Sequence, residues 1–377
     1  MWIILFLAVV LIAAVLSIYN SESLLLLEDV AAGAKPSRLK QRVSEPVRTT
    51  VRYQALGREY EADIYRPPGP AKAGILLVPG AAEKGKDDPR LVSFARSLAR
   101  AHYMVFAPTL PDVQQLRLRP ENARELAAAF SQFQQLARLE PSRPMGVGAF
   151  SYAAGPAIMA ALDEEIRDRV DFVVAVGGYY DLERVMGFMT TGDFDVDGRR
   201  EHITPRPYGR LVFAMTHMDF LDANDRKVIQ QFIEHYMRDP DTPLDDLLPG
   251  LGADGRAVYN FLQNRDSARV QELMQALPPA IRHNLDGLNL ARYDLGQLRA
   301  RLILIHGRHD DMIPYSESLA LRDAAPQADA FIVAGLEHVD IPPGIRDRYN
   351  MWRAIRALLR VRDSSSIRTS DKAGQQR

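Results

Sequence analysis

The sequence of 377 residues contains no cysteine. Disulfide bonds, zinc sites built on thiolates and a cysteine nucleophile are therefore excluded. The chain also lacks an excess of charge of either sign, with a formal net charge of −1, so its composition indicates no nucleic-acid partner. Apolar residues, by contrast, make up 47% of the chain, which is enough to form the core of one large domain or of two modest ones.

Charged side chains are also absent from residues 1–19, and nearly all of these residues are apolar. About 20 apolar residues span a bilayer as a helix, whereas a cleaved signal peptide would carry a basic segment before its apolar run. No Lys or Arg precedes this run, so we favour a retained single-pass anchor, of the bacterial inner-membrane kind, over cleavage. Residues 20–45 are expected to be an irregular tether. The cations between Lys35 and Arg42 favour a cytoplasmic domain, yet such anchors also commonly export the domain attached to them, so both orientations stay open.

Between residues 46 and 362, short apolar runs alternate with stretches of helical spacing. The runs that are typical of strands are Val47–Gln54, Tyr60–Tyr65, Ala73–Val78, Met104–Pro108, Met145–Phe150, Val170–Val176, Leu302–His306 and Ala330–Val333. Strands that alternate with helices predict an α/β fold, with a mostly parallel central sheet covered by helices on both faces. The Ser-, Lys- and Gln-rich end, residues 363–377, is predicted to be disordered.

A long interruption, residues 182–298, separates the sixth of these runs from the seventh. It is too long for a loop and has helical patches, so we interpret it as a mainly helical cap insertion in a core made of residues 46–181 and 299–362. An insertion at this point is expected to hang over the carboxyl edge of the sheet. Its large apolar side chains are expected to pack mostly within the cap insertion, with one or two facing the active site and limiting substrate length. They are Met186, Phe188, Met189, Met215, Met218 and Phe220.

The segment Met145–Gly155 carries the clearest chemical pattern: an apolar run ends, a single serine comes next, and a helical pattern begins. A sharp strand-to-helix turn of this kind lifts a serine hydroxyl above the sheet, where it can act as a nucleophile. Glycine is usual two residues before and two after such a serine, and this chain has the small residues Ala149 and Ala153 there. Ser151 is therefore the candidate nucleophile, with a helix-capping serine as the alternative interpretation.

Acidic and basic partners for this serine come after later strands. Asp310 and Asp311 stand just after the run Leu302–His306, at the edge where parallel sheets assemble active sites, and Asp181 stands after the sixth run. A triad needs one carboxylate to hold its histidine in one tautomer and to stabilise the cation. His338 stands one helix and one strand further on, so serine, aspartate and histidine occur in the order of one known class of triad enzyme.

An oxyanion hole requires backbone N–H groups aimed at the place where negative charge develops. The loop Leu77–Ala82 comes after a strand-like run and could supply one N–H group, from Ala81. The residue after the nucleophile commonly supplies the second, which here is the N–H of Tyr152.

Taken together, residues 46–362 resemble the α/β-hydrolase superfamily, especially bacterial esterases and dienelactone-hydrolase-like or prolyl-oligopeptidase-like members. In this fold the acid usually stands in a Gly-x-x-Asp-x-x-Ile-Pro pattern, which favours Asp310. The sequence departs from the family pattern at Pro79 and at the two alanines that flank the serine. The resemblance implies acyl transfer to water, in which Ser151 attacks a carbonyl, His338 moves the proton and Asp310 orients His338.

We therefore expect a membrane-tethered hydrolase whose substrate is a small-molecule carboxylic ester. A peptidase or acyltransferase with the same triad stays open, as does a catalytically silent domain that binds a ligand. No cofactor or metal is indicated, because His306 and His309 lack the further ligands that a metal site needs. The calcium-loop-like run Asp193–Gly198 lacks the closing glutamate and is better interpreted as a hairpin turn. The sequence does not define an oligomeric state.

Overall fold

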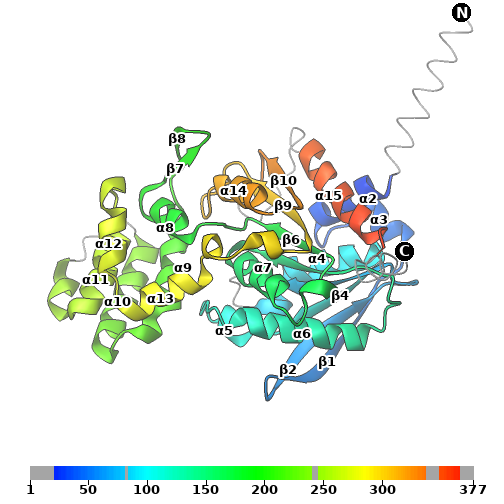
Figure 1. Cartoon of the computed structure of the whole chain (residues 1–377), viewed down its shortest axis with the longest axis horizontal. Helices are drawn as coiled ribbons and strands as arrows, with labels where there is room; N and C mark the ends of the chain where they lie inside the picture. Colours follow the sequence, from blue (N-terminus) through cyan, green and yellow to red (C-terminus); the bar gives the residue numbers. More distant parts are fainter. Residues whose placement is uncertain (1–20, 81–83, 240–244, 337–347, 366–377) are drawn as a thin grey trace, which may run out of the picture.

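The computed structural model describes residues 21–80, 84–239, 245–336 and 348–365. At its centre lies an eight-stranded sheet with the strand order β1-β2-β4-β3-β5-β6-β9-β10 (Figure 1). β2 runs antiparallel to both of its neighbours, β1 and β4, whereas the other neighbouring pairs are parallel. The mostly parallel sheet that the sequence predicts is thereby confirmed.

The strands match the apolar runs of the sequence closely. They are β1 (Val47–Ala55), β2 (Arg58–Arg66), β3 (Ala73–Val78), β4 (Tyr103–Pro108), β5 (Met145–Phe150), β6 (Phe172–Val176), β9 (Arg301–Gly307) and β10 (Ala328–Val333). The inner strands are continuous apolar runs because both of their faces are covered. Alternate residues serve opposite faces: Leu76 and Val78 of β3 pack in one buried cluster, and Ile75 and Leu77 pack in the other.

Helices cover both faces of this sheet (Figure 1). One face carries α2 (Glu22–Ala32), α3 (Arg38–Arg42), α4 (Pro89–Arg100) and α15 (Arg348–Arg362). The other face carries α6 (Asn122–Ala137), α7 (Ala154–Leu162) and α14 (Ser316–Ala324). The short helix α5 (Pro111–Gln114) comes after β4. The predicted covering of both faces is therefore also confirmed.

The segment that the sequence predicts as an irregular tether, residues 20–45, is instead folded. It forms α2 and α3, and Leu25, Leu26 and Leu27 of α2 are buried in the cluster that α4 and α15 share. The prediction was wrong because this segment is stabilised by tertiary contacts, which the sequence pattern does not show. The leucines form a stable helix only where a covered sheet face offers apolar surface to bury them.

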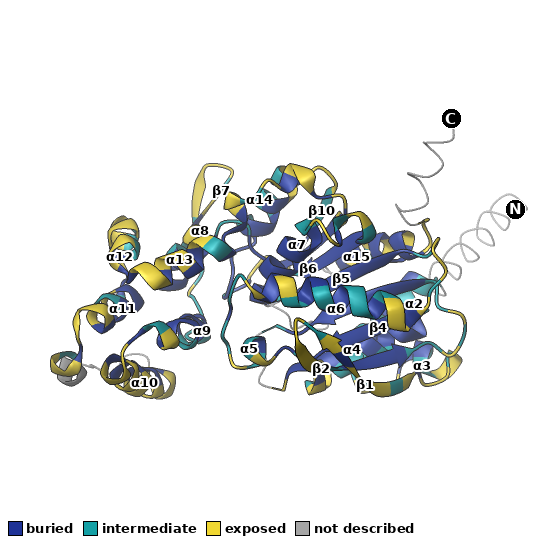
Figure 2. Ribbon diagram, turned by 60° about the horizontal axis from the view of Figure 1, so that its bottom comes forward, coloured by how far each residue is buried: buried dark blue, intermediate teal, exposed yellow. Residues whose placement is uncertain are grey.

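Between β6 and β9 the chain forms the region predicted as the cap insertion. Its elements are α8 (Leu182–Thr191), β7 (Asp193–Val196), β8 (Arg199–His202), α9 (Tyr208–His217), α10 (Ala223–Arg238), α11 (Ala253–Gln263), α12 (Val270–Ala276) and α13 (Pro279–Leu288). The predicted hairpin is confirmed, since β7 and β8 pair antiparallel around Asp197 and Gly198, both at positive φ. The helices stand together on one side of the sheet, and their outer surfaces are exposed (Figure 2).

Two terminal predictions fall on residues that the structure does not describe: the membrane anchor, residues 1–19, and the greater part of the predicted tail, residues 366–377. The described chain begins just before α2, directly after the apolar segment. Within the described ranges, no helix has the length and apolarity that crossing a membrane requires.

Candidate active site

Ser151 stands at the turn between β5 and α7, where the sequence places the nucleophile. Its backbone φ is +57°, in the left-handed region that residues other than glycine rarely occupy. A 3-10 turn over Ser151–Ala153 leads directly into α7, so the serine lies inside the turn. A helix-capping serine would instead have extended backbone. Strained backbone of this kind persists where the surrounding structure imposes it, and it is concentrated at functional sites.

Small residues around the serine make this turn possible. Ala149 and Ala153 are both buried, and alanine at these positions leaves enough room where glycine is usual. On the facing loop, a Cβ added to Gly80 would lie 3.2 Å from the carbonyl oxygen of Phe150 and 3.6 Å from Cβ of Ser151. The end of β3 therefore approaches the serine closely, as the predicted oxyanion loop must.

Asp310 is fully buried beyond the end of β9. Its Oδ1 accepts hydrogen bonds from the backbone N–H groups of Met312, at 2.8 Å, and Ile313, at 3.0 Å. Its Oδ2 lies 3.3 Å from Nε2 of His306, a buried ring that also contacts Ser318 Oγ and the carbonyl oxygen of Ile313. These contacts hold the carboxylate in one orientation, which is the requirement for the acid of a triad.

The two alternative acids have other partners. Asp311 pairs with Arg206, with 3.0 Å between Oδ2 and Nε, and its carbonyl oxygen accepts a hydrogen bond from the Arg206 N–H group at 2.9 Å. Asp311 thereby ties the cap insertion to the end of β9. Asp181 caps the start of α8 by accepting a hydrogen bond from the N–H group of Glu183 at 3.0 Å. The geometry therefore favours Asp310.

Tyr152, the residue after the candidate nucleophile, is buried. Burial and, to a lesser extent, the negative charge of Asp310 raise the pKa of its phenol. Met312, whose N–H group donates a hydrogen bond to Asp310, lines the same cavity as Ser151 and Tyr152, although β5 and β9 are separated by β6 in the sheet. The fold thus brings Ser151, Tyr152 and the segment that holds Asp310 to one cavity.

His338, the predicted base, and Ala81, the predicted first oxyanion donor, lie outside the described residues. The described residues next to them in the chain reach the site. Gly80 and Leu336 both line the cavity that contains Ser151. A Cβ added to Gly307 would lie only 2.0 Å from the carbonyl oxygen of Leu336, so the chain at Leu336 passes directly against the end of β9, just before Asp310.

A cavity of about 570 Å³ opens beside Ser151, within the usual size range of ligand pockets. Ser151 and Gly80 border it from the core loops, and Tyr208 and Val212 of α9 border it from the cap insertion. The remaining lining comes mainly from α2, α4, α15 and apolar strand residues. The cap insertion therefore forms one part of the boundary, and helices on one face of the sheet form a larger part.

The large apolar residues of the cap insertion pack away from this cavity. Phe188 is fully buried against Phe194, with 5.7 Å between ring centroids, in a small cluster with Tyr315. Met186 and Met189 belong to the main buried core. Among the described residues, none of the six cap side chains named above lines the cavity. The prediction that one or two of them face Ser151 is therefore wrong, since Phe188 packs with Phe194 and Tyr315 and the other five pack in or against the main buried core.

Three features of the site were missed or misjudged from the sequence. His306 was considered only as a metal ligand, yet both of its ring nitrogens have protein partners beside Asp310. A histidine at the end of a buried apolar run was the available signal. Arg206 and the end of α2 gave no signal, because their partners are distant in sequence.

In the described part of the chain, no group of three or more His, Asp or Glu side chains is arranged so that it could hold a metal ion.

Solved structures with similar folds define the class of the architecture. The chain is similar to a protein of Legionella pneumophila that is assigned as a hydrolase, with a TM-score of 0.54 and 15% identity over 90% of this chain and 95% of that one. It is also similar to an acylaminoacyl peptidase in complex with Z-Gly-Gly-Phe-chloromethyl ketone, with a TM-score of 0.50 and 12% identity over 86% of this chain and 43% of that one. A dienelactone hydrolase from Anabaena variabilis matches at a lower TM-score of 0.43, with 14% identity over 85% and 96% of the two chains.

The chain thus has the α/β-hydrolase fold. It spans less than half the length of the acylaminoacyl peptidases that it matches. No family model and no curated protein matches the chain. At these identities the likeness establishes the fold, and activity has to be argued from the site.

Proposed function

We propose that this protein is a serine hydrolase that cleaves carboxylic esters through an acyl-enzyme on Ser151. The observation that carries the proposal is the positive φ of Ser151 at the turn between β5 and α7, beside a cavity of ligand size. A merely structural serine has no need of a strained turn that exposes its hydroxyl to a cavity.

The proposed reaction has two steps. In the first, His338 accepts the proton of Ser151 while the serine oxygen bonds to the acyl carbon, and the alcohol leaves with the proton that His338 returns. In the second, water attacks the acyl-enzyme, His338 again serves as base, and the carboxylic acid is released. Asp310 orients His338, and the N–H groups of Tyr152 and Ala81 stabilise the oxyanion in both steps.

Labelling with a fluorophosphonate tests the proposal directly. The probe is expected to attach to Ser151 alone, because only an activated serine attacks phosphorus at a useful rate. Ser151→Ala is expected to abolish both labelling and the hydrolysis of p-nitrophenyl esters while the melting temperature stays close to that of the parent. Labelling that persists in this variant would overturn the assignment of the nucleophile.

A peptidase is the second candidate, and the likeness in fold to acylaminoacyl peptidases is what favours it. The two activities share a triad and differ in the leaving group. An N-acyl peptide p-nitroanilide with the same acyl group as a p-nitrophenyl ester distinguishes them. We expect the ester to be cleaved much faster, and preferential cleavage of the anilide would replace the esterase proposal with the peptidase.

We also propose that residues 1–19 hold the domain at a membrane. The support is the uncharged apolar sequence of this segment, without a preceding basic residue. The full-length chain is expected to stay in membrane fractions after a carbonate wash, and a chain lacking residues 1–19 is expected to be released. Recovery of a mature form that begins near residue 20 would show cleavage instead.

A further inference from the structure

The cavity beside Ser151 runs along the sheet face that α2, α4 and α15 cover, and it extends well beyond the catalytic residues. Val176 of β6 and Ile305 of β9 point to this face and line the cavity. Phe94 of α4 and Ile355 of α15 line it from the opposite side. The C-terminal end of α2 also lines it, through Val30, Ala31 and Gly33. The space thus reaches from the nucleophile to the helix that precedes the whole hydrolase core.

Four apolar side chains on this lining stay partly exposed although they pack against the buried cluster of the same face. They come from four different elements and are Val30, Phe94, Phe150 and Val176. The rings of Phe94 and Phe150 meet edge to face, with 5.5 Å between centroids, right next to Ser151. An apolar ligand in this space would remove the exposed carbon surface from water and gain dispersion contacts with it.

The charged residues of the lining already have partners. Arg90 pairs with Asp88 at 3.1 Å, and Arg206 pairs with Asp311 at 3.0 Å. A charged substrate group would have to compete with these ion pairs and would lie among apolar side chains, where an unpaired charge is costly. The chemistry of the lining therefore suits an aliphatic group.

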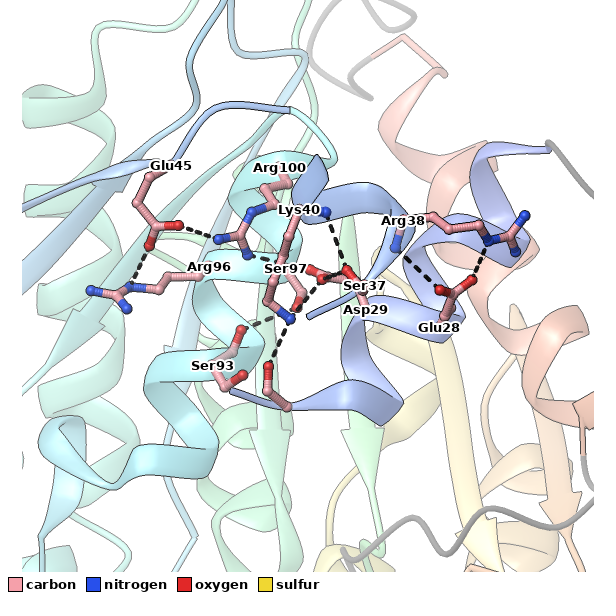
Figure 3. A network of polar contacts seen from close by, with 11 residues as sticks. Glu28, Asp29, Ser37, Arg38, Lys40, Glu45, Ser93, Arg96, Ser97 and Arg100 are labelled. Carbon is pink, nitrogen blue, oxygen red and sulfur yellow. Dashed lines mark hydrogen bonds and ion pairs between the residues drawn. The ribbon is translucent and has the colours of Figure 1, made fainter. Parts of the chain in front are cut away.

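The end of α2 is held in place by a buried polar network, which Figure 3 shows. Asp29 of α2 is fully buried and lies 2.8 Å from Nζ of Lys40 and 3.3 Å from Nη1 of Arg100 in α4. Lys40 also donates a hydrogen bond to the carbonyl oxygen of Gly33, at 2.8 Å, and Gly33 lines the cavity. These contacts fix the position of the C-terminal end of α2, and with it this part of the cavity wall.

We propose that this cavity binds an unbranched aliphatic acyl chain of the ester whose carbonyl Ser151 attacks, and that Val30 at the end of α2 determines how long that chain can be. The inference rests on the proposed function and adds to it a substrate class, esters of medium-chain to long-chain fatty acids. The wall that limits the chain belongs to the N-terminal helices, and the cap insertion does not supply it.

The test compares p-nitrophenyl acetate, octanoate and palmitate as substrates of the full-length chain and of Val30→Phe. The added ring occupies space that the acyl chain needs, and one methylene in an apolar pocket already changes kcat/KM by about tenfold or more. The ratio of kcat/KM for octanoate to that for acetate is therefore expected to fall at least tenfold. Val30→Ala enlarges the space and is expected to shift the preference towards palmitate.

Ala32→Phe is the matched control, since Ala32 stands on the same helix and is not among the described residues that line the cavity. It is expected to leave the octanoate-to-acetate ratio within about twofold of the parent, well below the change that one pocket methylene causes. A Val30→Phe protein that labels normally with the fluorophosphonate but keeps the parental ratio would overturn the inference while the proposed function stands.

A binding measurement separates the inference from catalysis. In Ser151→Ala, a fluorescent long-chain fatty acid is expected to bind, and adding Val30→Phe is expected to raise its Kd at least tenfold. If the parent hydrolyses no ester but this difference in Kd is found, the proposed function fails and the acyl-chain site remains. If neither variant binds the fatty acid, the acyl-chain site is refuted whatever the catalytic result.

Discussion

Two segments are added to the α/β-hydrolase core: the cap insertion and the N-terminal helix pair α2–α3. Each of them lines the cavity at Ser151 with a different share of its residues. The cap insertion, residues 182–298, is large, most of its buried apolar residues belong to the main core cluster, and it contributes Tyr208 and Val212 of α9 to the cavity. The N-terminal pair α2–α3 is small, and its buried leucines belong to the cluster that α4 and α15 share. The smaller segment nevertheless supplies part of the wall of the cavity.

This contrast shows that the size of an added segment is a poor guide to its influence on a site. A large insertion must bury its many apolar residues, and Phe188 and Met189 are buried where the insertion packs against the core. A short helix pair buries its apolar side chains against the core, so its ends are placed by core contacts. The influence of an added segment on the active site therefore depends on which of its side chains line the cavity.

The largest effect is expected just beyond the end of β9, where Asp310 lies and where Arg206 of the cap insertion contacts Asp311. Asp310→Asn should lower kcat by about four orders of magnitude, because the amide cannot hold the histidine in the required tautomer. Asp311→Asn removes only a half-exposed ion pair with Arg206 and should cost about 1 kcal/mol or less of stability. Steady-state kinetics with one ester checks both variants. A greater loss of kcat in Asp311→Asn would mean that attachment of the cap insertion controls the chemistry.

The interior of the cap insertion should affect stability without affecting selectivity. Phe188→Ala empties a fully buried aromatic site and should lower the free energy of unfolding by about 4 kcal/mol. Denaturant titration measures this loss, and the exposed residue Leu56, changed to Ala, serves as a control that should change little. The acyl-length profile should be that of the parent. A changed profile in Phe188→Ala would remove the contrast between the two added segments.

A substitution in the N-terminal segment should change both the stability of the protein and its preference for acyl length. Asp29→Ala leaves the buried guanidinium of Arg100 without one of its partners and should cost about 3 kcal/mol. The end of α2 should then shift and change the octanoate-to-acetate ratio as well. Glu28→Ala, which removes a partly exposed ion pair with Arg38 and a hydrogen bond from the Arg38 backbone N–H, is the control and should have a much smaller effect on both quantities. A destabilised Asp29→Ala protein with an unchanged ratio would show that α2 does not shape the cavity.

The smallest effect is expected from acid. Burial alone would raise the pKa of Asp29, but hydrogen bonds from Lys40, Ser37 and Ser97 outweigh it and lower the pKa. The carboxylate therefore stabilises the fold above its unfolded pKa of about 4 and loses this contribution as the pH falls through its lower folded pKa. The difference in melting temperature between the parent and Asp29→Asn should thus narrow below about pH 4. A difference in melting temperature that stays constant down to pH 2 would show that Asp29 is not ionised in the folded protein.

The strands and the serine turn were predictable because their signals are local. Ala73–Val78 and Met145–Phe150 are apolar runs whose bounds coincide with β3 and β5. The turn at Ser151 was predictable because small residues flank it between a strand pattern and a helix pattern. The tether was mispredicted because the leucines of α2 have a short, uninformative pattern, and their burial depends on α15, which is more than three hundred positions away.

Local patterns in the chain specified the alternation of strands and helices, the hairpin at Asp197-Gly198 and the order of the candidate triad, because backbone preference and apolar spacing act within short windows. The burial of Asp310, the pairing of Asp311 with Arg206 and the reach of α2 to the cavity were established only by the assembled fold. These outcomes depend on contacts between residues far apart in the chain, such as Asp29 with Arg100, whose stability exists only once the sheet and its helices have assembled.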